Sequence, residues 1–335
     1  YKKGIDYKIN PLFNKCYFLA SKPKKILIVF ISYIKRFCQV FNLLLFHKKM
    51  DLVIIEYELF PYFPPVFEYL LRIRKINYFV DYDDAIFHKY DLNSNIIIRT
   101  LLKNKISKVI EYATKVIVCN TYLEDYAKKY NKNIFKLPTV VLLDKYLIEK
   151  PLKNDNKFII GWIGSKSTSM YIIEILEEMK KMVLKYPDVQ FDLIGFDRKI
   201  LSNNQIKECN INIIQWQEET EVENILKFDV GIMPLADTPW SKGKCGFKLI
   251  QYMSCKKPLI ASAVGVNTEI IHNGKNGILI YNKNEWFNAF EKLYFDKNLR
   301  EQMSLSNFDR INKYYSYDKN LEKYINEINF NRMYK

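Results

Sequence analysis

Two lysines and two glycines stand together in the second half of the chain, in the segment Gly243 to Lys248 (GKCGFK). An apolar run that we predict to be helical, Leu249 to Met253, follows directly. The amino end of a helix carries free backbone N–H groups and a positive dipole, and glycine lets the backbone approach a ligand closely. Lys244 and Lys248 add mobile positive charges. The segment predicts a cradle for a diphosphate, and a solvated lysine-rich loop is the alternative.

A second candidate for phosphate binding is the turn in IIGWIGSKST, residues 159–168. A buried strand meets a turn that contains Gly161 and Gly164, and we expect a helix to begin near Ser169. Small residues at such a turn bring the backbone N–H groups of Gly164 and Ser165 within reach of a phosphate. A tight strand-to-helix turn without a ligand is the alternative. A further small-residue turn, Ala263 to Asn267, follows a later strand.

Three aspartates, Asp81, Asp83 and Asp84, lie at the end of a predicted strand. Open α/β sheets place ligands at the carboxyl ends of their strands. Orientation of a substrate hydroxyl by Asp83 or Asp84 is our preferred interpretation; helix capping and metal binding are the alternatives. His88 stands alone, so we assign it a structural role.

We predict no metal site in this chain. Its six cysteines contain no C-x-x-C pair, and only three histidines are present to complete a zinc site. The same pattern, together with the lack of a recognisable signal peptide, predicts a reduced, cytoplasmic location.

Buried strands alternate with helices along both halves of the chain, which is typical of parallel sheets. In the first half we predict strands at residues 52–55, 77–81, 115–119 and 134–137 and helices at 24–49 and 96–113, with Asn120 capping a further helix. In the second half we predict strands at residues 158–162, 189–194, 211–215, 230–233 and 259–261 and helices at 171–185 and 299–334.

The polar, proline-containing stretch Asp144 to Lys157 marks a domain boundary. We therefore predict an N-terminal domain at residues 1–149, a C-terminal domain at 150–318, and a C-terminal helix at 319–335 that packs back on the N-terminal domain. An α/β domain normally begins with a buried strand and a glycine-rich turn, and neither precedes the opening words YKKGIDYKIN. We expect the first strand to be missing.

Positive charge is concentrated in the first half: residues 1–150 contain 26 Lys+Arg and 14 Asp+Glu, whereas the remainder contains 26 and 23. This favours an anionic lipid surface or a lipid pyrophosphate as partner, with a solvated surface as the alternative; we predict no nucleic-acid partner. Residues 24–49 predict peripheral contact with an anionic membrane, or a core helix with a solvated edge. The expected membrane anchors are Phe30, Tyr33, Phe37 and Phe41. Because Lys35 and Arg36 interrupt the apolar stretch, we do not expect a transmembrane span.

Residues 228–300 resemble the C-terminal domain of glycosyltransferase family 4, in the branch whose motif reads GKCGFKLxQYM followed by GVNxEII and NGxL. DYDDAIF (81–87), VCNTYL (118–123) and LPTVV (137–141) resemble the same branch, so the likeness covers nearly the whole chain. It implies the α/β fold called GT-B, with two Rossmann-like doubly wound parallel-sheet domains facing an interdomain cleft. It also implies a retaining, metal-independent hexosyltransferase without a cofactor, whose second domain binds a nucleoside diphosphate sugar and whose first domain binds the acceptor.

The resemblance implies roles for individual residues. Lys244 and Lys248 would neutralise the diphosphate as the sugar–phosphate bond breaks, and Asp83 or Asp84 would orient the acceptor hydroxyl. The donor would contact Gly164, Ser165, Cys245, Gly246, Phe247, Gln251, Val266 and Asn267. Trp216 is a stacking candidate for the base, with core packing as the alternative.

One position departs from the family pattern. Broader members carry two glutamates with seven residues between them around the glycine-rich turn, whereas this chain has Gly243 and Gln251 at those places. An amide can still hydrogen-bond ribose hydroxyls but supplies no carboxylate.

These patterns together predict a glycosyltransferase that acts on a glycan or lipid-linked acceptor in surface polysaccharide biosynthesis, such as lipopolysaccharide or capsule. We expect it in the cytoplasm, with the inner face of the membrane as the alternative. A sugar-nucleotide epimerase or hydrolase on the same fold is one alternative. A non-catalytic lipid- or nucleic-acid-binding protein is the other.

Overall fold

The computed structural model describes residues 5–14, 16–17, 20–46, 50–148 and 156–330. The chain forms two compact units: the first comprises Tyr1–Asp81, Ile86–Ile117 and Ala127–Ile134, and the second comprises Tyr82–Ala85, Val118–Tyr126 and Phe135–Lys335. The predicted boundaries at residues 149 and 318, and the packing of residues 319–335 on the first domain, stay predictions.

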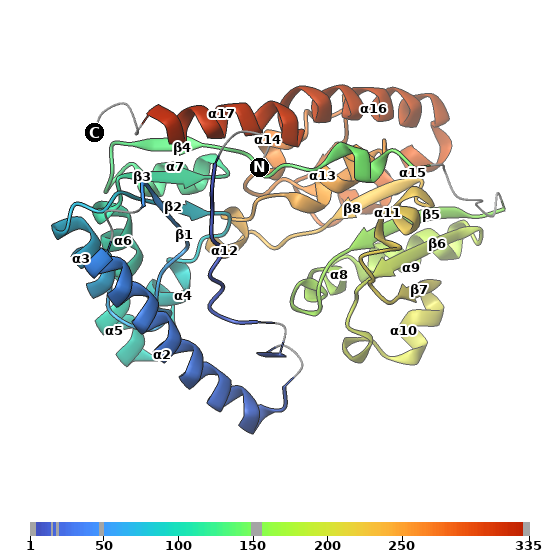
Figure 1. The fold of residues 1–335 in the computed structure, drawn as a ribbon. Coiled ribbons are helices and arrows are strands. Elements are labelled where there is room, and N and C mark those ends of the chain that lie inside the picture. Colours follow the sequence, from blue (N-terminus) through green and yellow to red (C-terminus); the bar gives the residue numbers. More distant parts are fainter. Residues whose placement is uncertain (1–4, 15, 18–19, 47–49, 149–155, 331–335) are drawn as a thin grey trace. The chain divides into compact units, whose positions relative to one another are not determined.

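The first sheet has four strands in the order β1-β2-β3-β4, and β1 and β2 pair in parallel (Figure 1). Its strands are β1 (Val53–Glu56), β2 (Tyr78–Tyr82), β3 (Lys115–Val118) and β4 (Ile134–Lys136). The helices of the first unit are α2 (Lys22–Phe46), α3 (Val66–Ile73), α4 (His88–Asp91), α5 (Ile96–Leu102) and α6 (Lys105–Tyr112). All four predicted strands are confirmed to within one or two residues.

The helix predicted at residues 96–113 is two helices. Asn95 begins α5, because its Oδ1 accepts hydrogen bonds from the backbone N–H groups of Ile97 and Ile98 at 2.9 and 3.4 Å. The chain then breaks at Lys103 and Asn104 before α6 starts. The predicted cap at Asn120 is confirmed, because its Oδ1 accepts from the Leu123 N–H at 2.9 Å at the start of α7 (Thr121–Ala127).

A buried ion pair holds the first unit together. The Lys105 ammonium on α6 pairs with the Glu58 carboxylate, and both side chains are almost fully buried. Lys105 also donates to the Phe60 carbonyl, and the Tyr90 hydroxyl donates to Glu58 at 2.7 Å. Burial lowers the pKa of Lys105, and the Glu58 carboxylate opposes that shift.

The second sheet has six parallel strands in the order β10-β9-β8-β5-β6-β7. The strands are β5 (Phe158–Ile163), β6 (Val189–Ile194), β7 (Ile211–Ile214), β8 (Val230–Met233), β9 (Leu259–Ser262) and β10 (Ile278–Ile280). This is the order of a doubly wound sheet, whose winding reverses between β5 and β8. Five of the six strands confirm the sequence prediction; β10 was not predicted.

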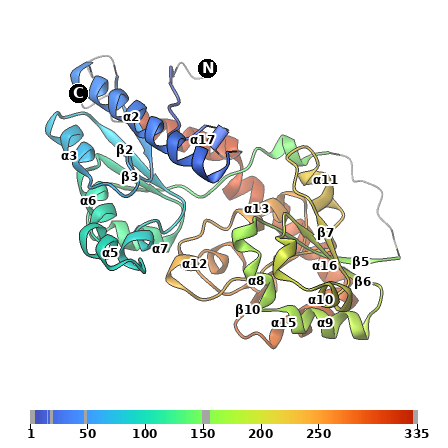
Figure 2. The ribbon, with the colours of Figure 1, turned by 90° about the horizontal axis from the view of Figure 1, so that it is seen from below.

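Helices cover both faces of this sheet (Figure 2). One apolar core forms against α8 (Met170–Ile173), α9 (Leu176–Lys185) and α15 (Glu285–Phe295), and the other against α11 (Glu221–Leu226), α13 (Phe247–Ser254) and α14 (Asn267–Ile270). The remaining helical elements are η2 (Leu143–Tyr146), η3 (Lys166–Thr168), η4 (Arg198–Ile200), α10 (Asn203–Glu208) and α12 (Pro239–Lys242).

Two aromatic rings pack directly over glycines of the sheet: Tyr252 from α13 and Phe228 from the segment before β8. Gly161 on β5 and Gly231 on β8 pair across the reversal point. A Cβ on Gly161 would lie 2.2 Å from the Phe228 ring, and one on Gly231 would lie 2.5 Å from the Tyr252 ring. The Tyr252 hydroxyl accepts from the Ile163 N–H at 2.9 Å and donates to the Ile232 carbonyl at 3.2 Å. These contacts tie α13 to both strands at the point where a ligand is expected.

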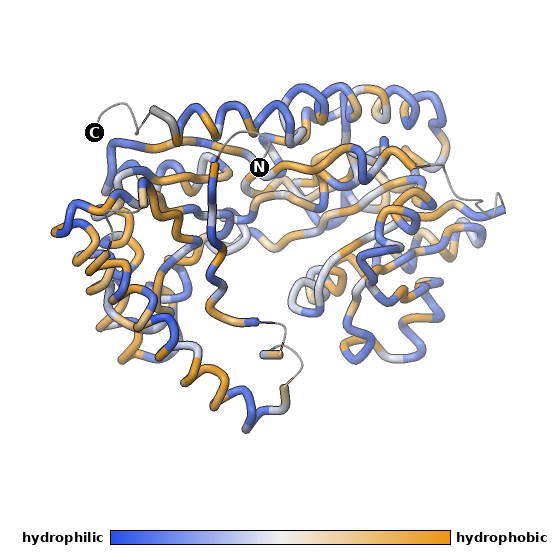
Figure 3. Tube along the Cα trace, in the orientation of Figure 1, coloured by the Kyte–Doolittle hydropathy of each residue, from blue (hydrophilic) through white to orange (hydrophobic). Residues whose placement is uncertain are grey.

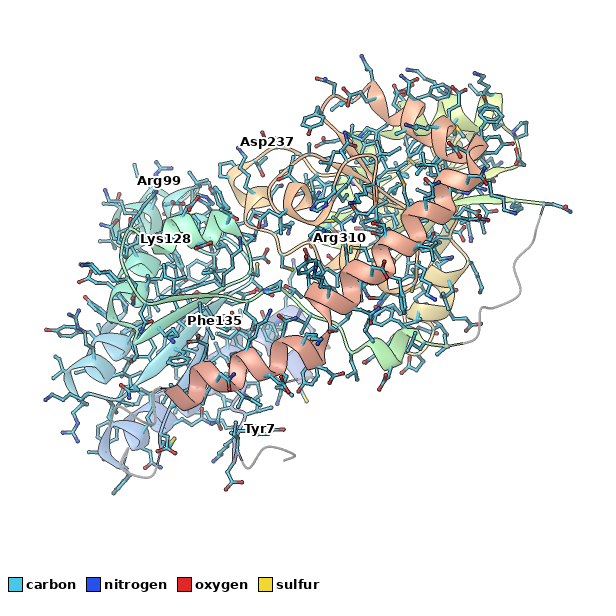
Figure 4. All side chains as sticks on the ribbon, turned by 90° about the horizontal axis from the view of Figure 1, so that it is seen from above. Tyr7, Arg99, Lys128, Phe135, Asp237 and Arg310 are labelled. Carbon is cyan, nitrogen blue, oxygen red and sulfur yellow. The ribbon has the colours of Figure 1, made fainter. Side chains whose placement is uncertain are left out.

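The helical tail predicted at residues 299–334 consists of α16 (Lys297–Arg310), the π-helical turn η5 (Ile311–Tyr315) and α17 (Tyr317–Phe330). Figure 4 labels Arg310 near the carboxyl end of α16. Its guanidinium donates to the Glu269 carbonyl at 3.3 Å and lies 5.4 Å from the Tyr314 ring centroid. This side chain therefore ties the tail to the residues around α14.

Within the part of the chain that the structure describes, α2 is long and apolar enough to cross a membrane, by length and composition alone. Its window has a mean hydropathy of 1.5, and 6% of that window is buried. Lys35 and Arg36 thus do not remove this helix from the candidates by composition, and the expectation that it does not span a membrane stays a prediction. Core helices and signal sequences meet the same criterion.

Two lysines on α6 give a matched test of the buried ion pair. Lys105→Met should lower the free energy of unfolding by about 3–5 kcal/mol, because it removes the nearest cation from the buried Glu58 carboxylate and leaves only the more distant Lys89 at 3.8 Å. Lys108→Met, three residues along the same helix, removes only a pair with the exposed Glu111 and should cause little change. Urea unfolding of both variants measures the difference, and equal losses would contradict the proposed importance of Lys105.

Candidate functional site

A cavity of about 820 Å³ lies at the carboxyl ends of the strands of the second sheet. Every residue that lines it belongs to the second unit. The lining residues are Asp84, Ile163, Gly164, Ser165, Lys166, Thr168, Gly195, Phe196, Ile213, Ile214, Gln215, Trp216, Glu221, Met233, Leu235, Lys244, Cys245, Gly246, Phe247, Lys248 and Gln251. The cavity therefore occupies the reversal point of the sheet, where doubly wound proteins bind their ligands.

Gly164 forms one wall of the cavity directly after β5. A Cβ at this position would lie 2.4 Å from the Trp162 ring and 2.7 Å from the Lys248 Nζ. No larger residue fits without displacing one of these groups. Ser165 caps the next turn, because its backbone N–H donates to the Thr168 Oγ1 at 3.1 Å. The turn thus has a required glycine. The N–H groups of Gly164 and Ser165 do not point freely at a phosphate as expected, because they already donate to the Ile194 carbonyl at 3.0 Å and to Thr168 Oγ1.

Lys248 reaches from the first turn of α13 to this wall. Its Nζ lies 4.3 Å from the centroid of the Trp162 ring and donates to the Thr168 Oγ1 at 3.2 Å. Burial and, to a lesser degree, the positive charge of Lys244 lower the pKa of Lys248 to about 7. The face of the indole ring favours the ammonium form but does not offset the loss of water. An anion placed here would restore the positive charge of Lys248.

Lys244 is the second cation of the cavity. Its Nζ lies 3.8 Å from the Asp84 Oδ1 and 5.8 Å from the centroid of the Trp240 ring. Burial raises the pKa of Asp84, and the Lys244 charge opposes that shift. The two lysines therefore bring two positive charges to one wall of the cavity. The carboxylate nearest to Lys244 is that of Asp84, and burial makes its negative form less favourable.

Backbone geometry presents both lysines to the cavity. Gly246 begins α13 in the left-handed conformation, with φ of 72°, which glycine adopts without strain. A Cβ on Gly243 would lie 2.3 Å from the Cβ of Ala85. The buried Asn120 amide donates to the carbonyls of Gly243 and Lys244 at 3.1 and 2.9 Å. The Asn residue of VCNT thus holds the GKCG loop in place, in addition to capping its own helix.

The opposite end of the cavity has a different chemistry. The Trp216 indole, 47% exposed, donates from Nε1 to the Glu221 Oε2 at 2.7 Å. The Gln251 amide donates to the Glu221 Oε1 at 2.9 Å, and the Lys145 Nζ lies 3.5 Å from the same oxygen. The exposed indole is available for stacking with a planar ring, so core packing does not explain Trp216. A carboxylate stands beside it to accept hydrogen bonds from hydroxyl groups.

The structure brings most of the predicted site residues together. Lys244, Lys248 and Asp84 line the cavity, as do Gly164, Ser165, Trp216, Cys245, Gly246, Phe247 and Gln251. Asp83, Val266 and Asn267 do not line it. Asn267 is fully buried and its amide donates to the Ser262 carbonyl at 3.0 Å, while Val266 packs against Gly246 from behind. The chemical roles assigned to all of these residues stay predictions.

Sequence reasoning missed Glu221, Lys145 and Thr168. Glu221 is the first residue of α11, in the connection that follows the carboxyl end of β7. Gly164 was chosen because it follows the carboxyl end of β5, and the same reasoning could have found Glu221. His88 lies outside the cavity, with its Nδ1 2.9 Å from the Asp91 Oδ1. Among the described residues, no group of three or more His, Cys, Asp or Glu side chains is arranged to hold a metal ion.

Residues 157–296 match the family model described as "Glycosyl transferases group 1". A probable sucrose-phosphate synthase of Thermosipho melanesiensis is 31% identical over 245 residues, which cover 65% of this chain and 55% of that protein. The chain thus spans about half the length of the curated relative it matches. The segment that matches the family model contains nearly all of the cavity-lining residues, with Asp84 outside it.

Solved structures resemble the chain over most of its length. Sucrose-phosphate synthase from Thermosynechococcus elongatus aligns with a TM-score of 0.70 and 16% identity, covering 94% of this chain and 81% of the other. HepE of Anabaena, solved with UDP and glucose, aligns with a TM-score of 0.66 and 13% identity, covering 87% and 80%. At such identities the likeness shows the fold alone, and the fold is GT-B with two parallel sheets, as the sequence predicted.

Substitution of Gly164 tests the tight wall of the cavity. Gly164→Ala should lower the free energy of unfolding by about 1–3 kcal/mol, because the added methyl group overlaps the Trp162 ring and the Lys248 Nζ. Lys166→Ala, in the exposed turn that follows, serves as the control and should leave stability nearly unchanged. Thermal and urea unfolding report the outcome. A Gly164→Ala protein as stable as the control would show that the wall can relax.

Proposed function

We propose that this chain, which carries a glycosyl transferases group 1 domain, is a glycosyltransferase that takes its sugar from a nucleoside diphosphate donor. The observation that carries the proposal is the pair Lys244 and Lys248, held on one wall of the cavity at the amino end of α13. Backbone N–H groups, the helix dipole and two ammonium groups converge there. A diphosphate is the anion whose size and charge fit this wall.

The proposed chemistry is stabilisation of the leaving group. As the bond between the sugar and the diphosphate breaks, negative charge grows on the departing phosphate oxygens. Lys248 and Lys244 would meet that charge in a site with little water, where a preorganised cation contributes several kcal/mol to the transition state. We propose that no metal and no cofactor take part, since these lysines perform the neutralisation, and that the sugar is transferred with retention of its configuration.

The nucleoside would occupy the other end of the cavity. We propose that the base stacks on Trp216, and that the ribose hydroxyls donate hydrogen bonds to Glu221. The fold shared with HepE, which was solved with UDP and glucose, supports a uridine diphosphate sugar as donor. Cavity volume is also sufficient, since about 820 Å³ falls within the range usual for ligand pockets of this size.

For the acceptor we propose a glycan or a lipid-linked sugar of surface polysaccharide biosynthesis, such as lipopolysaccharide or capsule, used on the cytoplasmic side. The positive charge of residues 1–150 supports an anionic acceptor such as a lipid pyrophosphate. We propose that Asp84 orients an acceptor hydroxyl, and its position in the cavity wall beside Lys244 supports this role.

Loss of Lys248 should weaken donor binding. Lys248→Met should reduce the affinity for UDP at pH 7 by about ten- to a hundredfold, since a charge-assisted hydrogen bond contributes about 1.5–3 kcal/mol. Lys242→Met, which removes an exposed neighbouring lysine paired with Asp237, should change the affinity less than twofold. Isothermal titration measures both. Wild-type affinity in Lys248→Met would remove the basis of the proposed role.

The same lysine predicts the pH dependence of binding. The pKa of Lys248 is about 7 in the free protein, and a bound diphosphate should raise it. Between the two pKa values binding takes up a proton, so the UDP affinity should fall as the pH rises from 7 to 9. The dependence should vanish in Lys248→Met. A flat profile in the wild-type protein would contradict the assignment.

The proposed activity is tested with a panel of nucleotide sugars. Titration against UDP-, GDP-, ADP- and dTDP-sugars should identify one nucleotide that binds at least tenfold more tightly than the others. Release of that nucleotide in the presence of glycan or lipid-linked acceptors then reports transfer, and NMR of the product reports the anomeric configuration. If the protein binds none of these donors, the function is not glycosyl transfer.

A further inference from the structure

Helix α2 differs from the other long helices in how it is attached. One side contacts the first unit: the Tyr33 hydroxyl donates to the Pro61 carbonyl at 2.7 Å, and the Phe37 ring meets the Phe67 ring edge-on at 5.6 Å. Val40 is its one buried residue. The Arg36 guanidinium donates to the Asn10 carbonyl at 2.6 Å. These contacts fix the orientation of the helix against α3 and the segment before it.

Much of the rest of α2 is apolar and exposed, and Figure 3 shows hydrophobic residues along most of the helix. We call the exposed apolar side chains the outer face; they are 50% to 73% exposed. Its members are Ile26, Leu27, Phe30, Ile31, Ile34, Phe41 and Leu45, and Phe37 lies at its edge, where its ring also contacts Phe67. Phe30, Ile34, Phe37, Phe41 and Leu45 follow the spacing of three and four residues that aligns side chains along a helix. Soluble proteins rarely leave so long an apolar stripe uncovered.

The charges on α2 indicate what covers the outer face. Between residues 22 and 46 the chain has five Lys or Arg residues and no Asp or Glu. Lys22 and Lys24 are exposed at the amino end, and Lys35 is exposed halfway along. An apolar stripe flanked only by positive charge complements a surface with an apolar interior and anionic headgroups.

We propose that α2 lies in the plane of an anionic phospholipid bilayer, with the outer face inserted at the boundary between headgroups and acyl chains. A second copy of the chain is a poorer occupant, because two such faces would bring together ten positive charges and no negative ones. A transmembrane orientation is also disfavoured. It would place Arg36 near the middle of the bilayer and would remove α2 from its contacts with Pro61 and Phe67.

Vesicle sedimentation tests the proposal and does not depend on the proposed glycosyl transfer. The wild-type chain should bind vesicles of phosphatidylcholine with 30% phosphatidylglycerol at least tenfold more tightly than vesicles of phosphatidylcholine alone. The double variant Leu27→Ser/Phe30→Ser should bind the anionic vesicles at least tenfold more weakly. Leu184→Ser/Phe295→Ser, which removes an equally exposed Leu and Phe from the second unit, should bind within twofold of wild type.

Three outcomes would overturn the proposal. The first is wild-type binding by Leu27→Ser/Phe30→Ser, and the second is no vesicle binding by the wild-type chain. The third is retention in the membrane after an alkaline carbonate wash, which would show a spanning helix instead of one in the plane. A UDP titration of the same variants should be unchanged, so that failure of this proposal can be told apart from failure of the donor site.

Discussion

The central constraint in this structure is the cost of holding Lys244 and Lys248 together in a partly dehydrated cavity. Each ammonium loses water, and each raises the cost of charging the other, so the pKa of Lys248 falls to about 7. The Trp162 ring and the Thr168 hydroxyl offset part of that cost. A bound polyanion would relieve both penalties at once, which is the physical basis of the proposed diphosphate site.

Contacts in the surrounding fold fix the positions of Lys244 and Lys248. Glycines on β5 and β8 receive the rings of Phe228 and Tyr252, so that α13 approaches the sheet closely at its reversal point. Asn120, far away in the sequence, holds the loop that carries Lys244. These contacts matter because the strength of a charge-assisted hydrogen bond depends on the distance and angle between its partners.

Sequence reasoning predicted most of the helices and strands, and the position of Lys244 and Lys248 before a helix, because both depend on local patterns. Buried runs of five or six residues identify strands, and a glycine and lysine cluster before an apolar run identifies a helix terminus. It missed β10, although β4, which is equally short, was predicted. It also joined α5 to α6 and α8 to α9, because the apolar period continues through both breaks. Glu221 was missed because its role depends on partners 5 and 30 residues away in the chain.

The pair formed by Glu221 and Gln251 explains the departure from the family pattern in physical terms. A glutamate at position 251 would place a second carboxylate within about 3 Å of the Glu221 carboxylate, and one of the two would have to stay protonated. The amide of Gln251 instead donates a hydrogen bond to Glu221 at 2.9 Å. Trp216 donates to the other oxygen of the same carboxylate. The cavity therefore keeps one carboxylate at this end, supplied by α11 instead of α13, and the glutamine adds a hydrogen-bond donor to that carboxylate.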